Sequence, residues 1–194
     1  MRICLLLLLF LIPAYAESPA TADAIQPEGR MQLFNGKDLS GWYTWLRDHR
    51  YEDPNGVFTV VNGNIRISGE DWGGVTTKQA YRNYHLIVEW KWGGKTWGAR
   101  EKRARDGGIL VHAVGPDGEY NKTWLESIES QIIEGGTGDI ILVAGKEKPR
   151  LTVETRSLGK ELYWQSGGTP TTRDSGRFDW WGRSPEWRDE LGFR

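Results

Sequence analysis

Short runs of alternating apolar and polar residues, separated by turns rich in glycine and proline, dominate this chain. Residues 57–61 and 64–68 are two such runs, and Asn62-Gly63 joins them. Asn-Gly between two alternating runs predicts a β-hairpin with a type I′ turn. Strands are also predicted by the runs at 85–92, 107–114, 128–134, 140–144 and 150–155. Because no segment of ten or more residues repeats its apolar positions at a helical period, we expect an all-β sandwich or jelly roll.

The run at 85–92 alternates well. Leu86, Val88 and Trp90 fall on one face of the predicted strand, and Glu89 and Lys91 fall on the other. This pattern predicts a long strand. After residue 166 the alternation fades, and Gly, Arg, Asp and Trp dominate up to Arg194. Since a sandwich needs its edges paired, we expect the fold to be incomplete at the C-terminus.

The N-terminal segment has the three parts of a secretory signal. A positive start at Met1-Arg2 precedes an apolar run over 3–12 and the small-residue ending Ala14-Tyr15-Ala16. About ten apolar residues are too few for a bilayer span of roughly 20. We therefore expect a signal peptide at 1–16, a flexible leader at 17–30 and one domain at 31–194. An uncleaved membrane anchor is the alternative.

Removal of the signal would leave a mature chain without cysteine, because the single cysteine is Cys4. The domain is then held by packing alone, although it is expected in the periplasm or outside the cell. The net charge is −1, and positive and negative residues are interspersed. That balance predicts neither a nucleic-acid partner nor a membrane partner after signal cleavage. A basic run at 100–105 is either a solvated loop or a small binding patch.

Eleven tryptophans are a large excess for a chain of 194 residues. Tryptophan is mainly a core residue, but in an exported protein it also stacks against sugar rings and donates one hydrogen bond. Trp97 and Trp124 fall in predicted loops beside the strands that carry polar residues. They are the candidates for substrate-binding platforms.

The run 128–134 carries two carboxylates and an amide. Glu129 and Gln131 share one face of the predicted strand, and Glu134 joins them only if one residue is bulged out. A pair of carboxyl groups on a sheet is the layout of a glycosidase site. Gln131 could bind sugar hydroxyls, or it could bond to the backbone in the core. Glu134 could instead cap a turn.

The element Asn35-Gly-Lys-Asp-Leu-Ser-Gly-Trp42 resembles the opening of the 3-keto-disaccharide hydrolase domain family. Stretches at 56–63, 84–93 and 127–139 resemble the same family in the same order, so that the resemblance covers about 31–145. It implies a concanavalin-like β-sandwich, export, and action on carbohydrates, with 3-keto-glycosides as substrates. Family members continue with further strands, so the resemblance also implies a C-terminally truncated chain.

The spacing E-x-Q-x-x-E further resembles the E-x-D-x-x-E strand of laminarinase-type β-glucanases. In that family the first Glu is the nucleophile and the last is the acid/base, which would assign these roles to Glu129 and Glu134. Gln131 stands where those enzymes have Asp. An amide supplies no charge to tune its neighbours' pKa values, which weakens the double-displacement mechanism here.

A keto sugar allows a different reaction. A 3-keto group acidifies the C2 proton, so that one base and one acid suffice for β-elimination of the glycosidic oxygen, followed by addition of water. His112, on the predicted strand 107–114, could supply acid/base catalysis near neutrality, or it could be structural. Asp106 could bind sugar hydroxyls or a cation, or it could form only a turn.

We therefore expect a hydrolase that cleaves 3-keto-glycosides. Glu129, His112 and Glu134 are its candidate catalytic residues, and Gln131, Asp106, Trp97 and Trp124 are its candidate substrate-binding residues. No cofactor is expected, and no metal, because no H-x-H or H-x-x-E spacing is present. A laminarinase-like retaining hydrolase and a non-catalytic carbohydrate-binding module are the alternatives, and the oligomeric state is open.

Overall fold

The computed structural model describes residues 24–180. The signal peptide predicted at 1–16, most of the predicted leader and the segment 181–194 lie outside this range. In the described part, eleven strands and one short 3₁₀ helix, η1 (Gly98–Arg100), follow one another. The strands are β1 (Trp42–Leu46), β2 (Phe58–Val61), β3 (Asn64–Ile67), β4 (Gly73–Thr77), β5 (Gly108–Val114), β6 (Glu126–Gln131), β7 (Ile140–Val143), β8 (Leu151–Leu158), β9 (Glu161–Trp164), β10 (Thr169–Arg173) and β11 (Gly176–Phe178). The predicted all-β class is confirmed.

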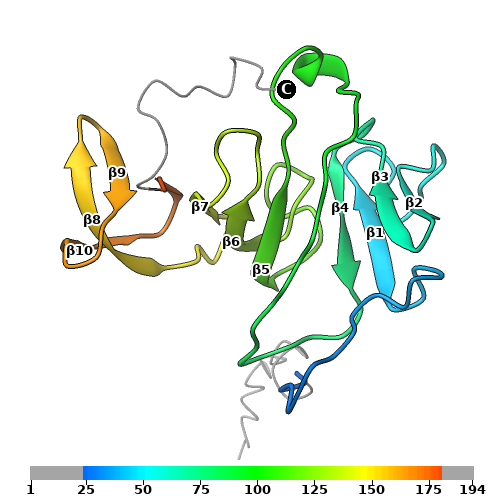
Figure 1. Ribbon diagram of the computed structural model, residues 1–194, viewed down its shortest axis with the longest axis horizontal. Helices are drawn as coiled ribbons and strands as arrows, with labels where there is room; N and C mark the ends of the chain where they lie inside the picture. The colour runs from blue at the N-terminus through cyan, green and yellow to red at the C-terminus, as the bar shows by residue number, and fades with distance from the viewer. Residues whose placement is uncertain (1–23, 181–194) are drawn as a thin grey trace, which may run out of the picture.

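All strand pairs of the described sheets are antiparallel, and the strands form four sheets. The largest sheet has the order β11-β7-β6-β5, and a three-stranded sheet has the order β10-β8-β9. The pairs β1-β4 and β2-β3 form the other two sheets. Figure 1 shows β5, β6 and β7 in the centre of the molecule, between β8–β10 on one side and β1–β4 on the other.

The hairpin predicted at 57–68 is confirmed as β2 and β3. Val61 pairs with Asn64 across the two-residue loop. Asn62 and Gly63 have φ of 49° and 74°. A type I′ turn needs positive φ at both central residues, and Asn-Gly provides it at low steric cost.

One face of the largest sheet builds the core between two sheets. Leu142 of β7 and Phe178 of β11 are buried against Val153 of β8, and Ile128 and Leu162 pack around them. Burial of a side chain such as Phe178 contributes about 1.5–3 kcal/mol. The fold is therefore a β-sandwich at this point, as the sequence predicts. A second cluster, of Leu46, Val57 and Phe58, joins β1 to β2.

The strand predicted at 85–92 is not formed, which corrects that prediction. The segment nevertheless runs antiparallel to β5. The Tyr84 ring stacks on His112 at 5.7 Å between centroids, and the Trp92 ring lies near Gly107 at the other end of β5. Among the described residues, however, no backbone hydrogen bond joins 85–92 to a neighbour. Ile87 is 74% exposed. Its ring contacts therefore place this segment beside β5, but no ladder of backbone hydrogen bonds holds it there.

Two strands form where the alternation fades. β10 pairs with β8, and β11 pairs with β7. β10 is rich in threonine, and the Thr155 and Thr171 hydroxyls hydrogen-bond at 2.7 Å across the ladder. Threonine is a good strand former without an apolar signature, which explains why the hydrophobic pattern misses this strand. No helix in residues 24–180 is long and apolar enough to cross a membrane.

Candidate active site

The second face of the largest sheet carries a row of four residues from four strands. Leu110 pairs with Glu129, Glu129 pairs with Ile141, and Ile141 pairs with Arg177. Residues directly opposite in antiparallel strands point to the same face. Phe178, next to Arg177, is buried in the sandwich core, so the row lies on the face away from that core. Ile141 is the apolar residue between Glu129 and Arg177 in this row.

Glu129 lies over the neighbouring strand because that strand carries a glycine. A Cβ atom added at Gly108 would lie 1.9 Å from Glu129 Oε1 and 2.5 Å from its Cγ and Cδ. No side chain larger than hydrogen can occupy this position without displacing the carboxyl group. A glycine inside a strand often marks such a close approach. Gly108 therefore fixes where the Glu129 carboxyl group lies.

The electrostatic surroundings of Glu129 favour its protonated form. Burial is the main cause, and the nearby Asp106 carboxylate adds to it, so that the pKa of Glu129 rises from 4.5 to about 7. Arg177 acts in the opposite direction but does not cancel these effects. Acid/base catalysis is most efficient when the pKa of the group lies near the working pH. Glu129 is thus poised to take up and release a proton near neutrality.

Asp106 comes to this site from the loop before β5. Its carboxylate forms an ion pair with Arg100 of η1, and both side chains are partly exposed. Asp106 is close enough to Glu129 to raise its pKa. The structure thus brings Asp106 and Glu129 together, as two candidates predicted for one site. Arg100, the first residue of the basic run 100–105, is thus the ion-pair partner of Asp106.

Glu134 is held away from this arrangement by Arg105. Glu134 Oε2 accepts a hydrogen bond of 2.6 Å from the Arg105 backbone N–H, and its Oε1 forms an ion pair with the Arg105 guanidinium. β6 ends at Gln131, so the bulge proposed to bring Glu134 onto the face of Glu129 is absent from β6. The irregularity lies instead in β5, between Val111 and Val114. Both oxygens of Glu134 anchor the loop after β6.

We expect Glu134→Gln to destabilise the fold by about 1–3 kcal/mol, because the largely buried Arg105 loses its charged partner. The corresponding drop in the melting temperature is about 2–4 °C per kcal/mol for a domain of this size. Asp48→Asn is the matched control, since the Arg47–Asp48 pair is exposed and such pairs contribute little. Thermal unfolding and turnover of both variants decide the matter. A loss of turnover of 100-fold or more with an unchanged melting temperature would support the catalytic role predicted for Glu134.

Gln131 shares the strand face of Glu129 but serves the backbone. Its side-chain oxygen accepts hydrogen bonds from the N–H groups of Ile132 (2.8 Å) and Ile133 (3.0 Å). The residue is 5% exposed. The structure therefore places the Gln131 oxygen in the turn after β6, where it satisfies two donors. Its predicted contact with substrate stays a prediction.

His112 occupies the irregular part of β5. Its φ of 52° is in the left-handed region, which non-glycine residues seldom adopt. The ladder to β6 shifts register between Val111 and Val114 around it. The imidazole is exposed and stacks on Tyr84. A bulge beside a sheet often redirects a side chain near a functional site, and His112 lies two residues from Leu110, which pairs with Glu129.

The two tryptophans predicted as platforms already have aromatic and polar neighbours. The Trp97 N–H donates to the Ser68 carbonyl at 3.0 Å, and Lys95 Nζ lies 3.2 Å from the ring centroid. Trp124 meets Trp72 edge to face at 5.7 Å. The faces of Trp97 are therefore partly covered by the protein itself. Sugar stacking by either residue stays a prediction.

Two residues of the site escape sequence reasoning, namely Arg177 and Gly108. Arg177 falls in the segment with little alternation, and its place opposite Ile141 comes only from the pairing of β11 with β7. Gly108 reads as an ordinary strand-initiating glycine. Trp92 lies against Gly107, and the Arg105 guanidinium lies 5.9 Å from its ring centroid.

The motif Asn35–Trp42 forms a hydrogen-bonded turn. Asn35 Oδ1 accepts from the backbone N–H groups of Lys37 and Asp38, at 2.8 and 3.0 Å. Hydrogen bonds from Ser40 and Asn35 lower the pKa of Asp38 to about 2. A hollow of about 140 Å³ lies beside this turn and is lined by residues of the motif. The element that carries the resemblance thus has a clear structural role.

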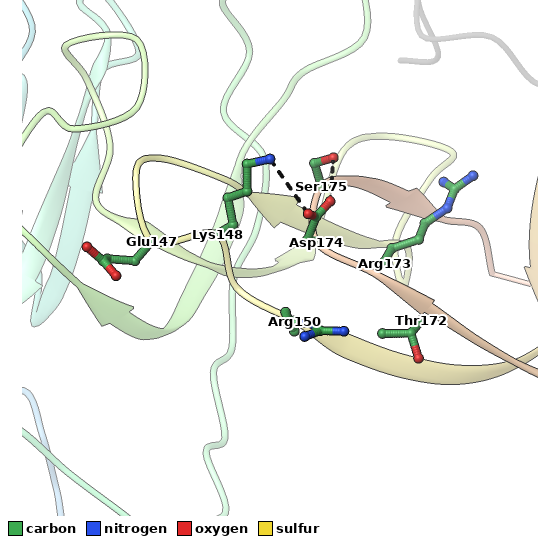
Figure 2. Close-up of a pocket in the computed structure, with 7 residues that line it drawn as sticks. All are labelled: Glu147, Lys148, Arg150, Thr172, Arg173, Asp174 and Ser175. Carbon is green, nitrogen blue, oxygen red and sulfur yellow. Dashed lines mark hydrogen bonds and ion pairs between the residues drawn. The ribbon is translucent and has the colours of Figure 1, made fainter.

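A larger hollow, of about 770 Å³, lies between the β7–β8 connection and the β10–β11 turn. Figure 2 shows Asp174 in it with Lys148 on one side and Ser175 on the other. Lys148 Nζ lies 3.6 Å from Asp174 Oδ2. The hollow has neither a half-buried acid nor a residue of the Glu129 row in its lining. We therefore place the candidate site at Glu129. Within residues 24–180, no group of three or more His, Cys, Asp or Glu side chains is arranged to hold a metal ion.

Comparison with known proteins gives one result. The family model described as the 3-keto-alpha-glucoside-1,2-lyase-like domain matches residues 29–167, which is well over half of the chain. No curated protein and no solved structure matches. The family is a carbohydrate-active one with a concanavalin-like sandwich, in agreement with the sheets and with the family predicted from sequence. The chain therefore belongs to the 3-keto-alpha-glucoside-1,2-lyase-like domain family.

Proposed function

We propose that this chain is an exported enzyme that cleaves 3-keto-glycosides, with Glu129 as the residue that removes the C2 proton. One observation carries the proposal. In a carbohydrate-active family, the half-buried Glu129 has a pKa raised to about 7 on the face of the sheet away from the sandwich core. A group of this kind is a functional-site candidate on physical grounds.

The chemistry follows from the ketone. The Glu129 carboxylate takes the C2 proton, and the electron pair of the C2–H bond forms an enolate whose charge lies on the C3 oxygen. Collapse of the enolate restores the ketone, forms a C1=C2 double bond and breaks the C1–O bond. We assign protonation of the departing oxygen to His112. Addition of water across C1=C2 then gives the free 3-keto sugar, so that elimination followed by hydration amounts to hydrolysis.

The retaining mechanism of laminarinase-type enzymes receives less support from the site. That mechanism needs two carboxyl groups about 5–5.5 Å apart, one of them as nucleophile. Glu134, the second carboxyl group predicted for it, is bound by the backbone and side chain of Arg105. Elimination from a keto sugar needs one base and one acid instead, the roles assigned to Glu129 and His112.

The test uses 3-keto-trehalose beside unoxidised trehalose, with the reaction run in D₂O. Release of glucose from the keto sugar alone, with deuterium at C2 of the 3-keto product, supports elimination and hydration. Release without deuterium at C2 indicates direct hydrolysis and contradicts the proposed route. Saturable binding of both sugars without any release would identify a carbohydrate-binding module instead.

Export is the second part of the proposal, and the predicted signal peptide at 1–16 supports it. Expression of the full chain in a bacterial host, followed by fractionation and N-terminal sequencing, tests it. A mature chain that begins after Ala16 in the periplasm or medium is the expected result. An intact chain in the cytoplasm would contradict it, and an intact chain in the membrane fraction would favour the anchor.

A further inference from the structure

The partly exposed guanidinium of Arg177 lies in the same cross-strand row as Glu129, with Ile141 between them. The carboxylate that balances its charge lies beyond hydrogen-bond distance. Arg177 Nε lies 3.7 Å from Oδ2 of the fully buried Asp139. This separation exceeds the 2.7–3.2 Å of an N–H···O hydrogen bond. The other oxygen of Asp139 accepts from the Trp180 backbone N–H at 2.7 Å. Asp139 thus orients Arg177 without occupying all of its donors.

The Arg177 guanidinium has hydrogen-bond donors that the described residues do not use. Among the described residues, none accepts a hydrogen bond from the Arg177 guanidinium, whose side chain is 29% exposed. Arg177 and Glu129 flank Ile141 from opposite sides in the same cross-strand row. Two strand spacings, about 10 Å, separate their backbones. Ile141, an apolar residue, is the one between them.

The backbone around Arg177 is fixed by its neighbours. Arg173 Nη1 donates to the Arg177 carbonyl at 2.7 Å, and Phe178 is buried in the sandwich core. Because Phe178 anchors the strand on one face, Arg177 must project from the other. The attraction between Arg177 and the Glu129 carboxylate, which lowers the pKa of Glu129, agrees with this placement.

We propose that Arg177 binds the C3 carbonyl oxygen of the sugar and stabilises the negative charge that this oxygen gains when Glu129 removes the C2 proton. The inference rests on the proposed function and names the residue by which the site selects a ketone over a hydroxyl group. An arginine only donates hydrogen bonds, so it satisfies a carbonyl oxygen fully but leaves the proton of a hydroxyl group without an acceptor. Charge develops on that oxygen in the transition state, where preorganised donors have their largest effect.

Arg177→Gln and Arg177→Lys test the assignment, with Arg150→Gln as the control. Arg150 is also exposed and cationic, but it lines the separate hollow of Figure 2. We expect Arg177→Gln to lower kcat on 3-keto-trehalose by about 100-fold to 1,000-fold. Arg177→Lys should recover part of this loss, because it keeps the charge. Arg150→Gln should match the wild type. The rate of deuterium exchange at C2, a direct measure of enolate formation, should fall together with kcat.

A purely structural role of Arg177 would give a different result. In that case Arg177→Gln would lower the melting temperature, and turnover per folded molecule would stay within twofold of the wild type, which overturns the proposal. Binding is measured separately by calorimetry in the Glu129→Gln background, where no turnover is expected. Preference for 3-keto-trehalose over trehalose should disappear when Arg177→Gln is added, and an unchanged preference would contradict the role of Arg177.

The same measurements separate this inference from the proposed function. If the wild type fails to turn over the keto sugar, the proposed function fails. The calorimetric preference for the ketone then still decides whether Arg177 recognises it.

Discussion

Replacing Glu129 with glutamine is expected to lower turnover of a 3-keto-glycoside by about 100-fold to 10,000-fold, the usual contribution of a general base. Glutamine has nearly the size of the protonated acid but cannot accept the C2 proton. Substrate binding should persist, so that kcat falls far more than KM changes. Steady-state kinetics with calorimetric binding measure both quantities. A variant that keeps more than a tenth of the wild-type kcat would exclude Glu129 as the base.

The pH dependence of stability provides an independent measure of the same carboxyl group. The pKa of Glu129 rises from 4.5 to about 7 in the folded state. Between these values the folded chain retains a proton on Glu129 that the unfolded chain has released, so the contribution of Glu129 to stability falls as pH rises from about 4.5 through 7. The loss amounts to at most about 3 kcal/mol. Glu129→Gln should remove this contribution and be the more stable protein at pH 8, as chemical denaturation at pH 4.5 and pH 8 can show.

Gly108→Ala is expected to lower kcat by about 100-fold while the fold persists, because a misplacement of about 1 Å is enough for such a loss. The new methyl group would lie 1.9 Å from Glu129 Oε1. The atoms that it meets belong to the end of a flexible side chain, so the carboxyl group moves and the strand does not. Kinetics and thermal unfolding of the variant should therefore diverge.

Gly107→Ala is the matched control for this substitution. A Cβ atom at Gly107 would lie 3.7 Å from the Trp92 ring and 3.9 Å from Ile132, which are ordinary contacts. Turnover close to that of the wild type is expected. If Gly108→Ala and Gly107→Ala behave alike, the position of the carboxyl group over β5 has no bearing on the reaction.

Local patterns predicted the fold where the structure depends on local chemistry. Asn62-Gly63 determines a turn through its own φ angles, and the hairpin formed as expected. The segment 85–92 shows the limit of such patterns. Its alternation states which residues share a face, but a strand also needs a partner with free N–H and C=O groups. That partner is a property of the tertiary fold, which periodicity does not contain.

The candidate site was predictable to a similar extent. Glu129 is visible in the sequence because a carboxylate on an apolar strand is unusual and chemically informative. Arg177 joins the site through the pairing of β11 with β7, which brings together residues 36 positions apart in the chain (141 and 177). Gly108 contributes by having no side chain, which leaves room for the Glu129 carboxyl group. The role of Glu134 depended on a register irregularity, which the structure places in β5 instead.

The segment 85–92 also has a consequence for the dynamics of the molecule. Free energies of opening vary along a chain, and segments without backbone hydrogen bonds open at almost no cost. We expect the amide hydrogens of 85–92 to exchange with solvent within seconds, whereas those of β6, paired on both sides, exchange only through larger openings. Hydrogen exchange followed by mass spectrometry measures this, and slow exchange across 85–92 would contradict it. Segment 85–92 would then fluctuate independently of β6, the strand that holds Glu129. Substrate could enter past this mobile segment while the Glu129 carboxyl group stays in place.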